Sequence, residues 1–178
     1  IFRTKGEDEY RKFQRENQDV PLGKGVAFPF IRRLLTLNKI NKSNPPVEVI
    51  LLSRNDPDTG LRVMNSIESH NLGITRAVFL QGRSPHKYIP ALDIELFLSA
   101  NSQDVNQAVM AGYPAGQILK GNIKDDVQDH ELRIAFDFDG VIADDSAEAV
   151  YQKSHVLADF HNYEAQHVNE THNPGPLK

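Results

Sequence analysis

Residues 131–146 read ELRIAFDFDGVIADDS, and this stretch decides the fold. The apolar run at residues 132–136 ends in two carboxylates, Asp137 and Asp139, and Gly140 follows directly. Such a run, bounded by a turn residue, predicts a buried strand of a parallel sheet. Open α/β sheets bind their ligands at the carboxyl ends of their strands. We therefore expect both carboxylates at the functional edge of a sheet.

The spacing of these two acids suits the chemistry of a phosphate ester. Gly140 lets the backbone turn, so that Asp137 faces a ligand while Asp139 curls over it. Asp137 is then placed to attack phosphorus as a nucleophile, and Asp139 to protonate the leaving oxygen. Mg²⁺ suits the same corner, because it binds hard oxygen ligands and needs only one or two carboxylates beside water. The alternative is a solvated strand end that carries two acids by chance.

Composition indicates a globular protein that does not bind nucleic acid. The 178 residues are enough for one domain with an ordinary core. The net charge of −4 argues against the basic surface that a nucleic-acid backbone selects. No apolar run approaches the roughly 20 residues of a membrane helix, and the lack of cysteine fits a reducing, cytoplasmic compartment. Nothing in the sequence fixes the oligomeric state, so a homo-oligomer stays open.

The chain alternates predicted strands and helices. Strands are predicted at residues 47–52, 75–80, 94–99 and 116–119, and helices at 6–17, 28–38, 58–70, 84–92, 101–112, 147–153 and 157–167. Short apolar runs predict the strands, and apolar residues recurring along one stripe predict the helices. This alternation indicates an α/β fold, a three-layer parallel sheet with helices on both faces. Residues 120–130 are the best candidate for a linker.

Histidines and aromatic residues gather near the end of the chain. The histidines are His155, His161, His167 and His172. Their spacings of six, six and five do not share a helical face, so we expect solvated surface rather than a metal site. Phe160 and Tyr163 are candidates to stack on a purine, with ordinary core packing as the alternative.

The two ends of the chain resemble each other weakly at a distance of 150 residues. Opposite Phe2, Tyr10, Phe13 and Gly25 fall Tyr151, Phe160, Tyr163 and Gly175, with one residue of slippage after the first pair. Ordered self-similarity indicates duplicated units, and chance aromatic spacing is the alternative. In a duplicated protein, Ser53 and Lys87 would correspond to the hydroxyl and the lysine that bind phosphate, as supplied by the first unit. Neutral residues at 99–101 support Mg²⁺ poorly, so we favour a degenerate first unit over one that completes the site at Asp137.

Longer stretches resemble known families. The motif Asp137-Phe138-Asp139-Gly140-Val141 resembles the first motif of the haloacid dehalogenase (HAD) superfamily of phosphohydrolases. Residues 47–101 and 132–151, and the helix before Pro174, are similar to the cytosolic 5'-nucleotidase type I family and its bacterial relatives. The resemblance implies a HAD-like, Rossmann-type fold. It divides the chain into a degenerate unit at residues 1–122, without its first strand, and the truncated start of a catalytic unit with a cap-like helical segment at 123–178.

The resemblance also implies an activity. It is the Mg²⁺-dependent hydrolysis of nucleoside 5'-monophosphates such as AMP or IMP through an aspartyl-phosphate intermediate. Asp137 would be the nucleophile and Asp139 the acid and base, both near the metal. Because the family's chains extend beyond both ends of this sequence, we expect it to be part of a longer protein. Two alternatives stay open, a non-catalytic nucleotide-binding or assembly unit and a HAD phosphatase for another phosphate ester.

Overall fold

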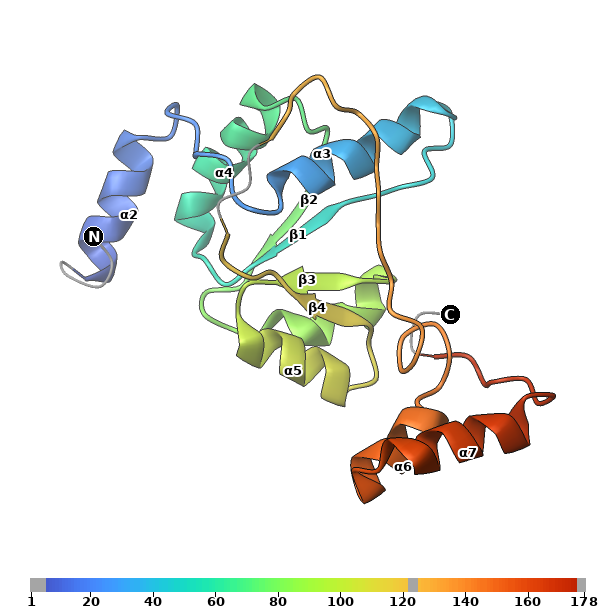
Figure 1. The fold of residues 1–178 in the computed structure, drawn as a ribbon. Helices are drawn as coiled ribbons and strands as arrows, with labels where there is room; N and C mark the ends of the chain where they lie inside the picture. Colours follow the sequence, from blue (N-terminus) through green and yellow to red (C-terminus); the bar gives the residue numbers. More distant parts are fainter. Residues whose placement is uncertain (1–5, 122–124, 176–178) are drawn as a thin grey trace.

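The computed structural model describes residues 6–121 and 125–175, and it has an α/β fold (Figure 1). The elements in chain order are α2 (Glu7–Glu16), α3 (Phe28–Thr36), η1 (Leu37–Lys39), β1 (Ile50–Ser53), α4 (Pro57–Ser69), β2 (Arg76–Phe79), η2 (Pro85–Tyr88), η3 (Pro90–Leu92), β3 (Phe97–Ser99), α5 (Ser102–Met110), β4 (Ala115–Gln117), α6 (Ser146–Ser154) and α7 (Leu157–His167). The predicted elements up to residue 119 are confirmed in place, except that residues 84–92 form two short 3₁₀ helices. The two predicted helices near the end of the chain are also confirmed.

Two βαβ units, β1-α4-β2 and β3-α5-β4, form the centre of the molecule. In each unit the two strands are parallel, as a helical crossover requires. The strands β1 and β3 end alike, because the backbone N–H two residues after each final serine donates to that serine's Oγ at 3.1 Å. A cap then starts each helix, Asp56 for α4 and Asn101 for α5. The repeated local pattern of strand, serine and capped helix therefore produces the same geometry twice.

The expectation of one continuous sheet is not confirmed. Among the described residues β1 pairs only with β2, and β3 only with β4. The two pairs are joined by side chains instead of backbone hydrogen bonds, since Leu52 of β1 packs against the buried cluster of Ile89, Phe97 and Ala108. The α/β class is confirmed, while the three-layer arrangement and the duplication stay predictions.

A buried ion pair also joins the two units. The carboxylate of Asp104, at the start of α5, is 4% exposed and accepts hydrogen bonds from Arg54 Nε at 3.0 Å and from Ser84 Oγ at 3.0 Å. Arg54 follows β1, and its Nη1 also donates to the carbonyl of Gly82 after β2. Burial pushes the pKa of Asp104 upward, but the hydrogen bonds from Arg54 and Ser84 outweigh it and leave the pKa below its ordinary value. The pair therefore holds the loops after β1 and β2 against α5.

The predicted strand at residues 132–136 is wrong. This segment is assigned no regular structure, and it runs extended past the βαβ units to the hairpin of α6 and α7 (Figure 1). A strand needs a neighbour with which to exchange hydrogen bonds, and none of the described strands pairs with this segment. Its apolar side chains consequently stay outside a core, with Ile134 46% exposed and Phe136 52% exposed.

The described part of the linker before this segment contacts α3. Residues 125–131 form a turn against α3, and the predicted domain boundary at residues 122 and 123 lies outside the described residues. The helices α6 and α7 pack on each other, apart from the βαβ units (Figure 1). None of the helices in the described part of the chain has the length and apolar character that crossing a membrane requires.

Candidate functional site

Asp137 and Asp139 lie in a tight turn between the extended segment and α6. Gly140 has a φ of 71°, a left-handed conformation that glycine adopts with little strain. The amide of Ala143 donates to the carbonyl of Phe138 at 2.9 Å, and Asp139 forms an isolated β-bridge with Ala143. The predicted turn at Gly140 is therefore confirmed.

The surroundings of the two carboxylates differ from the prediction. Both side chains are exposed, whereas the sequence predicts the carboxyl edge of a buried sheet. The difference follows from the missing strand, because a segment without a ladder cannot deliver side chains to a sheet edge. Asp137 Oδ1 accepts a hydrogen bond from the backbone N–H of Phe138 at 2.8 Å, which orients that carboxylate locally.

Asp144 fastens this turn to the last described residues. Its Oδ1 accepts from the Ser146 hydroxyl at 2.6 Å, and its Oδ2 accepts from the backbone and side-chain amides of Asn173 at 2.9 and 3.0 Å. The hydrogen bond from Ser146, followed by that from the Asn173 backbone, holds the pKa of Asp144 well below its usual range. Asp144 Oδ1 also accepts a hydrogen bond from the backbone amide of Ser146, the first residue of α6, at 3.2 Å. Since donors already occupy both oxygens, Asp144 is a poor candidate for a metal ligand.

A cavity of about 510 Å³ is lined by residues of α6, of α7 and of the segment after α7. Its lining includes His161, Tyr163, Glu164, His167, Glu170 and His172. The rings of Tyr163 and His167 stack with centroids 4.0 Å apart. The ring of His172 meets the ring of Phe138 edge-on at 6.1 Å, and Phe138 lies between the two aspartates in the sequence. Three of the four clustered histidines thus surround one hollow next to the candidate site.

The histidines do not form a metal centre. Within residues 6–121 and 125–175 no group of three or more His, Cys, Asp or Glu side chains has the geometry to hold a metal ion. Asp137 and Asp139 are the two carboxylates that the sequence predicts to lie near a metal ion. Two carboxylates fit Mg²⁺, which keeps several waters and takes oxygens from a substrate phosphate.

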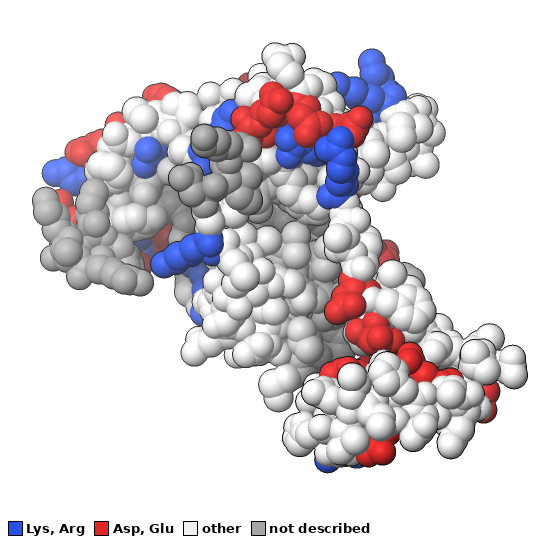
Figure 2. Space-filling model, in the orientation of Figure 1, with Lys and Arg blue, Asp and Glu red and all other residues white. Residues whose placement is uncertain are grey.

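Acidic residues outnumber basic ones in the part of the chain around the turn. Residues 134–175 contain eight Asp and Glu residues against one lysine. Figure 2 shows acidic side chains gathered on this end of the molecule, while most of the basic side chains in view lie on the other end. A phosphate dianion would be repelled here unless a cation accompanied it. The charge distribution is therefore a second reason to expect a divalent cation with an anionic substrate.

The candidate residues of the first unit lie elsewhere. Ser53 ends β1, with its Oγ bonded to the amide of Asn55, and Lys87 lies in η2. In the described structure neither forms a hydrogen bond or ion pair with Asp137 or Asp139. A second cavity, of about 480 Å³, lies beside the loops after β1 and β2, and its charged side chains include Glu7, Arg11, Arg54 and Asp56. Its acids and bases balance, and Arg11 is already paired with Asp56 at 2.6 Å.

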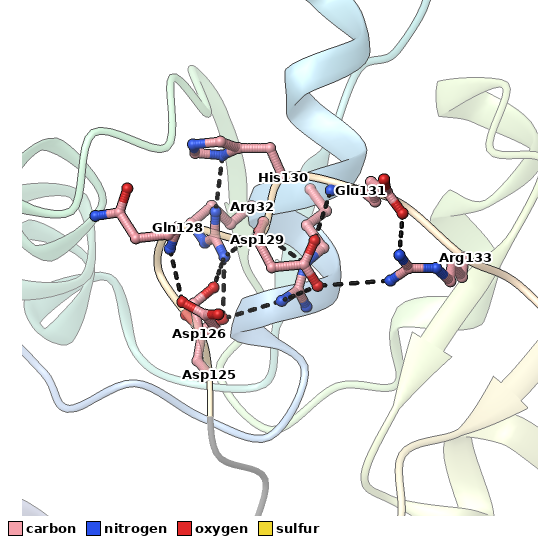
Figure 3. Close-up of polar contacts among 9 residues, drawn as sticks. Arg32, Asp125, Asp126, Gln128, Asp129, His130, Glu131 and Arg133 are labelled. Atoms are coloured by element: carbon pink, nitrogen blue, oxygen red, sulfur yellow. Dashed lines mark hydrogen bonds and ion pairs between the residues drawn. The ribbon is translucent and has the colours of Figure 1, made fainter.

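Arg32 and Arg33 of α3 belong to no motif in the sequence. Both contact the linker that leads to the aspartate turn (Figure 3). The signal that points to them is charge complementarity, because two adjacent arginines on a helix face an acid-rich linker at residues 125–131.

Comparison with known proteins decides the family. Residues 1–178 match the sequence profile of a family described as 5'-nucleotidase. The chain belongs to the 5'-nucleotidase family. It is 30% identical over 183 residues to human Cytosolic 5'-nucleotidase 1B, a match that covers 100% of this chain and 30% of that relative. The chain thus spans about 30% of the length of the curated relative it matches. No solved structure matches the chain.

The aspartate turn of this 5'-nucleotidase family member is closed by Gly175. The amide of Gly175 donates to the carbonyl of Ile142 at 2.8 Å, and Gly175 is buried. A Cβ at this position would lie 2.3 Å from the carbonyl oxygen of Val141 and 2.7 Å from that of Ala143. Gly175→Ala is therefore expected to push the last described residues off the turn.

Hydrogen exchange of the Asp144 amide tests this prediction, since that amide donates to the carbonyl of Asn173 at 2.9 Å. Its exchange should accelerate in Gly175→Ala. The matched control is Gly25→Ala, where an added Cβ meets nothing within 4 Å. Equal exchange in the two variants would show that the closure does not depend on Gly175.

Proposed function

We propose that this protein hydrolyses nucleoside 5'-monophosphates to nucleoside and phosphate, with Asp137 and Asp139 as the reacting groups. The family match over the whole chain carries the proposal, and the D-x-D-G-V motif on the turn at Gly140 supports it. A cytoplasmic location, suggested by the relative's name and the lack of cysteine, belongs to the same proposal.

The proposed reaction has two steps. A carboxylate oxygen of Asp137 attacks phosphorus, the bond to the ester oxygen breaks, and Asp139 gives its proton to the departing nucleoside. Water then attacks the aspartyl phosphate, Asp139 takes a proton from that water, and phosphate leaves with Asp137 restored. Mg²⁺ held by the two carboxylates would neutralise charge between them and the phosphate. The exposure of both side chains gives a substrate and water direct access.

We place the nucleoside in the cavity of about 510 Å³, whose lining residue His172 contacts Phe138 of the turn. The stacked rings of Tyr163 and His167 offer a flat surface for a base, and Glu164 and Glu170 offer acceptors for its N–H groups. In this proposal Tyr163 contacts the purine, and the substrate is a nucleotide rather than a sugar phosphate.

Phosphate release from the intact protein tests the proposal. We expect release from AMP or IMP with Mg²⁺, much slower release from glucose 6-phosphate, and loss of activity when EDTA removes the metal. Activity should return when Mg²⁺ is added back. Equal rates with glucose 6-phosphate would contradict the nucleotide specificity, and full activity in EDTA would contradict the metal.

The non-catalytic alternative has one observation in its favour, because among the described residues no third carboxylate or histidine joins the two aspartates in a group that could hold a metal ion. Calorimetry with AMP and Mg²⁺ separates the two readings. Tight binding without any phosphate release would support a nucleotide-binding unit and contradict the hydrolase.

A further inference from the structure

The linker that leads to the aspartate turn is attached to α3 by Arg32. The guanidinium of Arg32 donates from Nη2 to Asp125 Oδ1 at 3.0 Å and to the carbonyls of Asp126 and Asp129 at 3.0 and 3.1 Å. Its Nη1 lies 3.3 Å from His130 Nδ1. These partners come from four residues of one turn, which lies 93 to 98 residues further along the chain (Figure 3). Arg32 is therefore the centre of the contact.

Arg33 holds the same turn from the adjacent position. Its Nε donates to the carbonyl of Asp129 at 3.1 Å, and its Nη2 lies 3.4 Å from Asp129 Oδ2 and 3.5 Å from Asp125 Oδ1. The hydrogen bond from the Glu131 amide, with the positive charges of Arg33, Arg133 and Arg32, lowers the pKa of Asp129. The two arginines thus share the Asp125 carboxylate and the Asp129 carbonyl, and Arg33 alone also contacts the Asp129 carboxylate, an arrangement that fixes the turn in more than one direction.

The contact is partly removed from water. The side chains of Arg32 and Asp125 are 16% and 12% exposed. Arg32 Nε and Asp125 Oδ2 are buried and have no hydrogen-bond partner of their own in the described residues. Loss of Arg32 would leave the mostly buried Asp125 with only the longer contact to Arg33, at 3.5 Å, so the attachment is more than a weak surface ion pair.

The turn at residues 125–131 connects α3 to the segment that carries the aspartates. It is stiffened internally, because Asp126 Oδ1 accepts from the Gln128 amide and Asp129 Oδ1 from the Glu131 amide, both at 2.9 Å. Residues 132–136 then run extended and have no backbone hydrogen bonds to the described part of the molecule. The attachment at α3 is consequently the nearest upstream anchor for Asp137.

We propose that Arg32 and Arg33 are positioning residues that hold the aspartate turn in place relative to the βαβ units. The proposal rests on the proposed function for its catalytic consequence. Arginine is needed because its planar fork reaches several acceptors at once, whereas a lysine ammonium is a single point of charge on a flexible stem. The first part of the chain then contributes to activity by orienting the aspartates without contacting the substrate.

Arg32→Lys in the intact protein tests the proposal, because it keeps the charge and removes the fork. We expect kcat to fall by about tenfold or more while KM stays within about twofold, since misplacement affects the reacting atoms more than binding. The matched control is Arg76→Lys, whose arginine pairs with Glu48 on the exposed surface and does not touch the linker. Asp125→Asn is the second variant, and it should also lower kcat while leaving KM nearly unchanged, with a smaller loss of kcat than in Arg32→Lys.

A distance measurement makes the test independent of activity. Residues 1–178 contain no cysteine, so Ile40→Cys and Ile134→Cys, at two exposed sites, can carry spin labels with no competing cysteine in this part of the protein. The distance distribution should broaden in Arg32→Lys and not in Arg76→Lys. An unchanged distribution would overturn the positioning role, and so would a broadened one with unchanged kcat. A wild-type protein that releases no phosphate would defeat the proposed function, while the distances would still decide whether Arg32 holds the segment.

Discussion

Asp137→Asn is expected to abolish phosphate release, with kcat lowered by about 10⁴-fold or more, as when other enzymes lose their nucleophile. An amide oxygen cannot form the aspartyl phosphate, so the first proposed step has no attacking group. The substitution keeps the size of the side chain and its acceptor for the Phe138 amide, and the turn should therefore survive. Steady-state phosphate release from AMP or IMP with Mg²⁺ measures the effect.

The matched control is Asp159→Asn, the same chemical change in the first turn of α7. It should leave kcat within about twofold, because nothing places Asp159 near the reacting groups. Asp139→Asn gives a further check. An ester with a good leaving group needs less protonation than a nucleoside, so this variant should lose less activity with p-nitrophenyl phosphate than with AMP. Substantial activity in Asp137→Asn would remove Asp137 from the reaction.

Asp104→Ala is expected to destabilise the fold by about 3 kcal/mol, the lower end of the cost of breaking a buried ion pair. The lower end applies because Arg54 is 36% exposed and can recover some hydration. Urea unfolding measures the change. The matched control is Glu48→Ala, which removes an exposed carboxylate from Arg76 and should leave the unfolding midpoint nearly unchanged. Equal midpoints in the two variants would show that the buried pair does not join the βαβ units.

The same pair predicts a pH dependence. The pKa of Asp104 is lowered from its ordinary 3.8 in the folded protein, so the folded state favours the ionised form. The resulting stabilisation is complete above the ordinary pKa and is lost as the pH falls through the lowered value. The stability advantage of the wild type over Asp104→Asn should therefore shrink below about pH 4. An advantage that grows in acid would contradict the assignment.

The sequence predicts well those features that depend on neighbouring residues. Asn101 and Ser102 are both suited to cap α5, and the structure has Asn101 in that place, where its side chain accepts a hydrogen bond from the Gln103 amide at 2.9 Å. Gly140 turns the chain as expected, and Pro29 lies in the first turn of α3. Caps, turns and amphipathic stripes use partners within about four residues, so a short stretch of sequence contains all the information they need.

The features that the sequence does not predict depend on contacts between residues far apart in the chain. The apolar run at residues 132–136 has the local pattern of a strand, yet strand formation needs a second strand beside it. The Arg54–Asp104 pair spans 50 residues, and the contacts of Arg32 with the linker span more than 90. Periodicity cannot detect such pairs, and only the opposite charges of α3 and the linker hint at the second one.

The row of half-exposed apolar side chains before and within the aspartate turn affects how the protein behaves at high concentration. Ile134, Phe136 and Phe138 alternate with Ala135, Asp137 and Asp139. Extended segments of this kind associate with one another, and interspersed charges are the usual gatekeepers against aggregation. Asp137 and Asp139 are the charges interspersed in this segment. A lower soluble yield of Asp137→Asn would accordingly report a lost gatekeeper and not a lost fold.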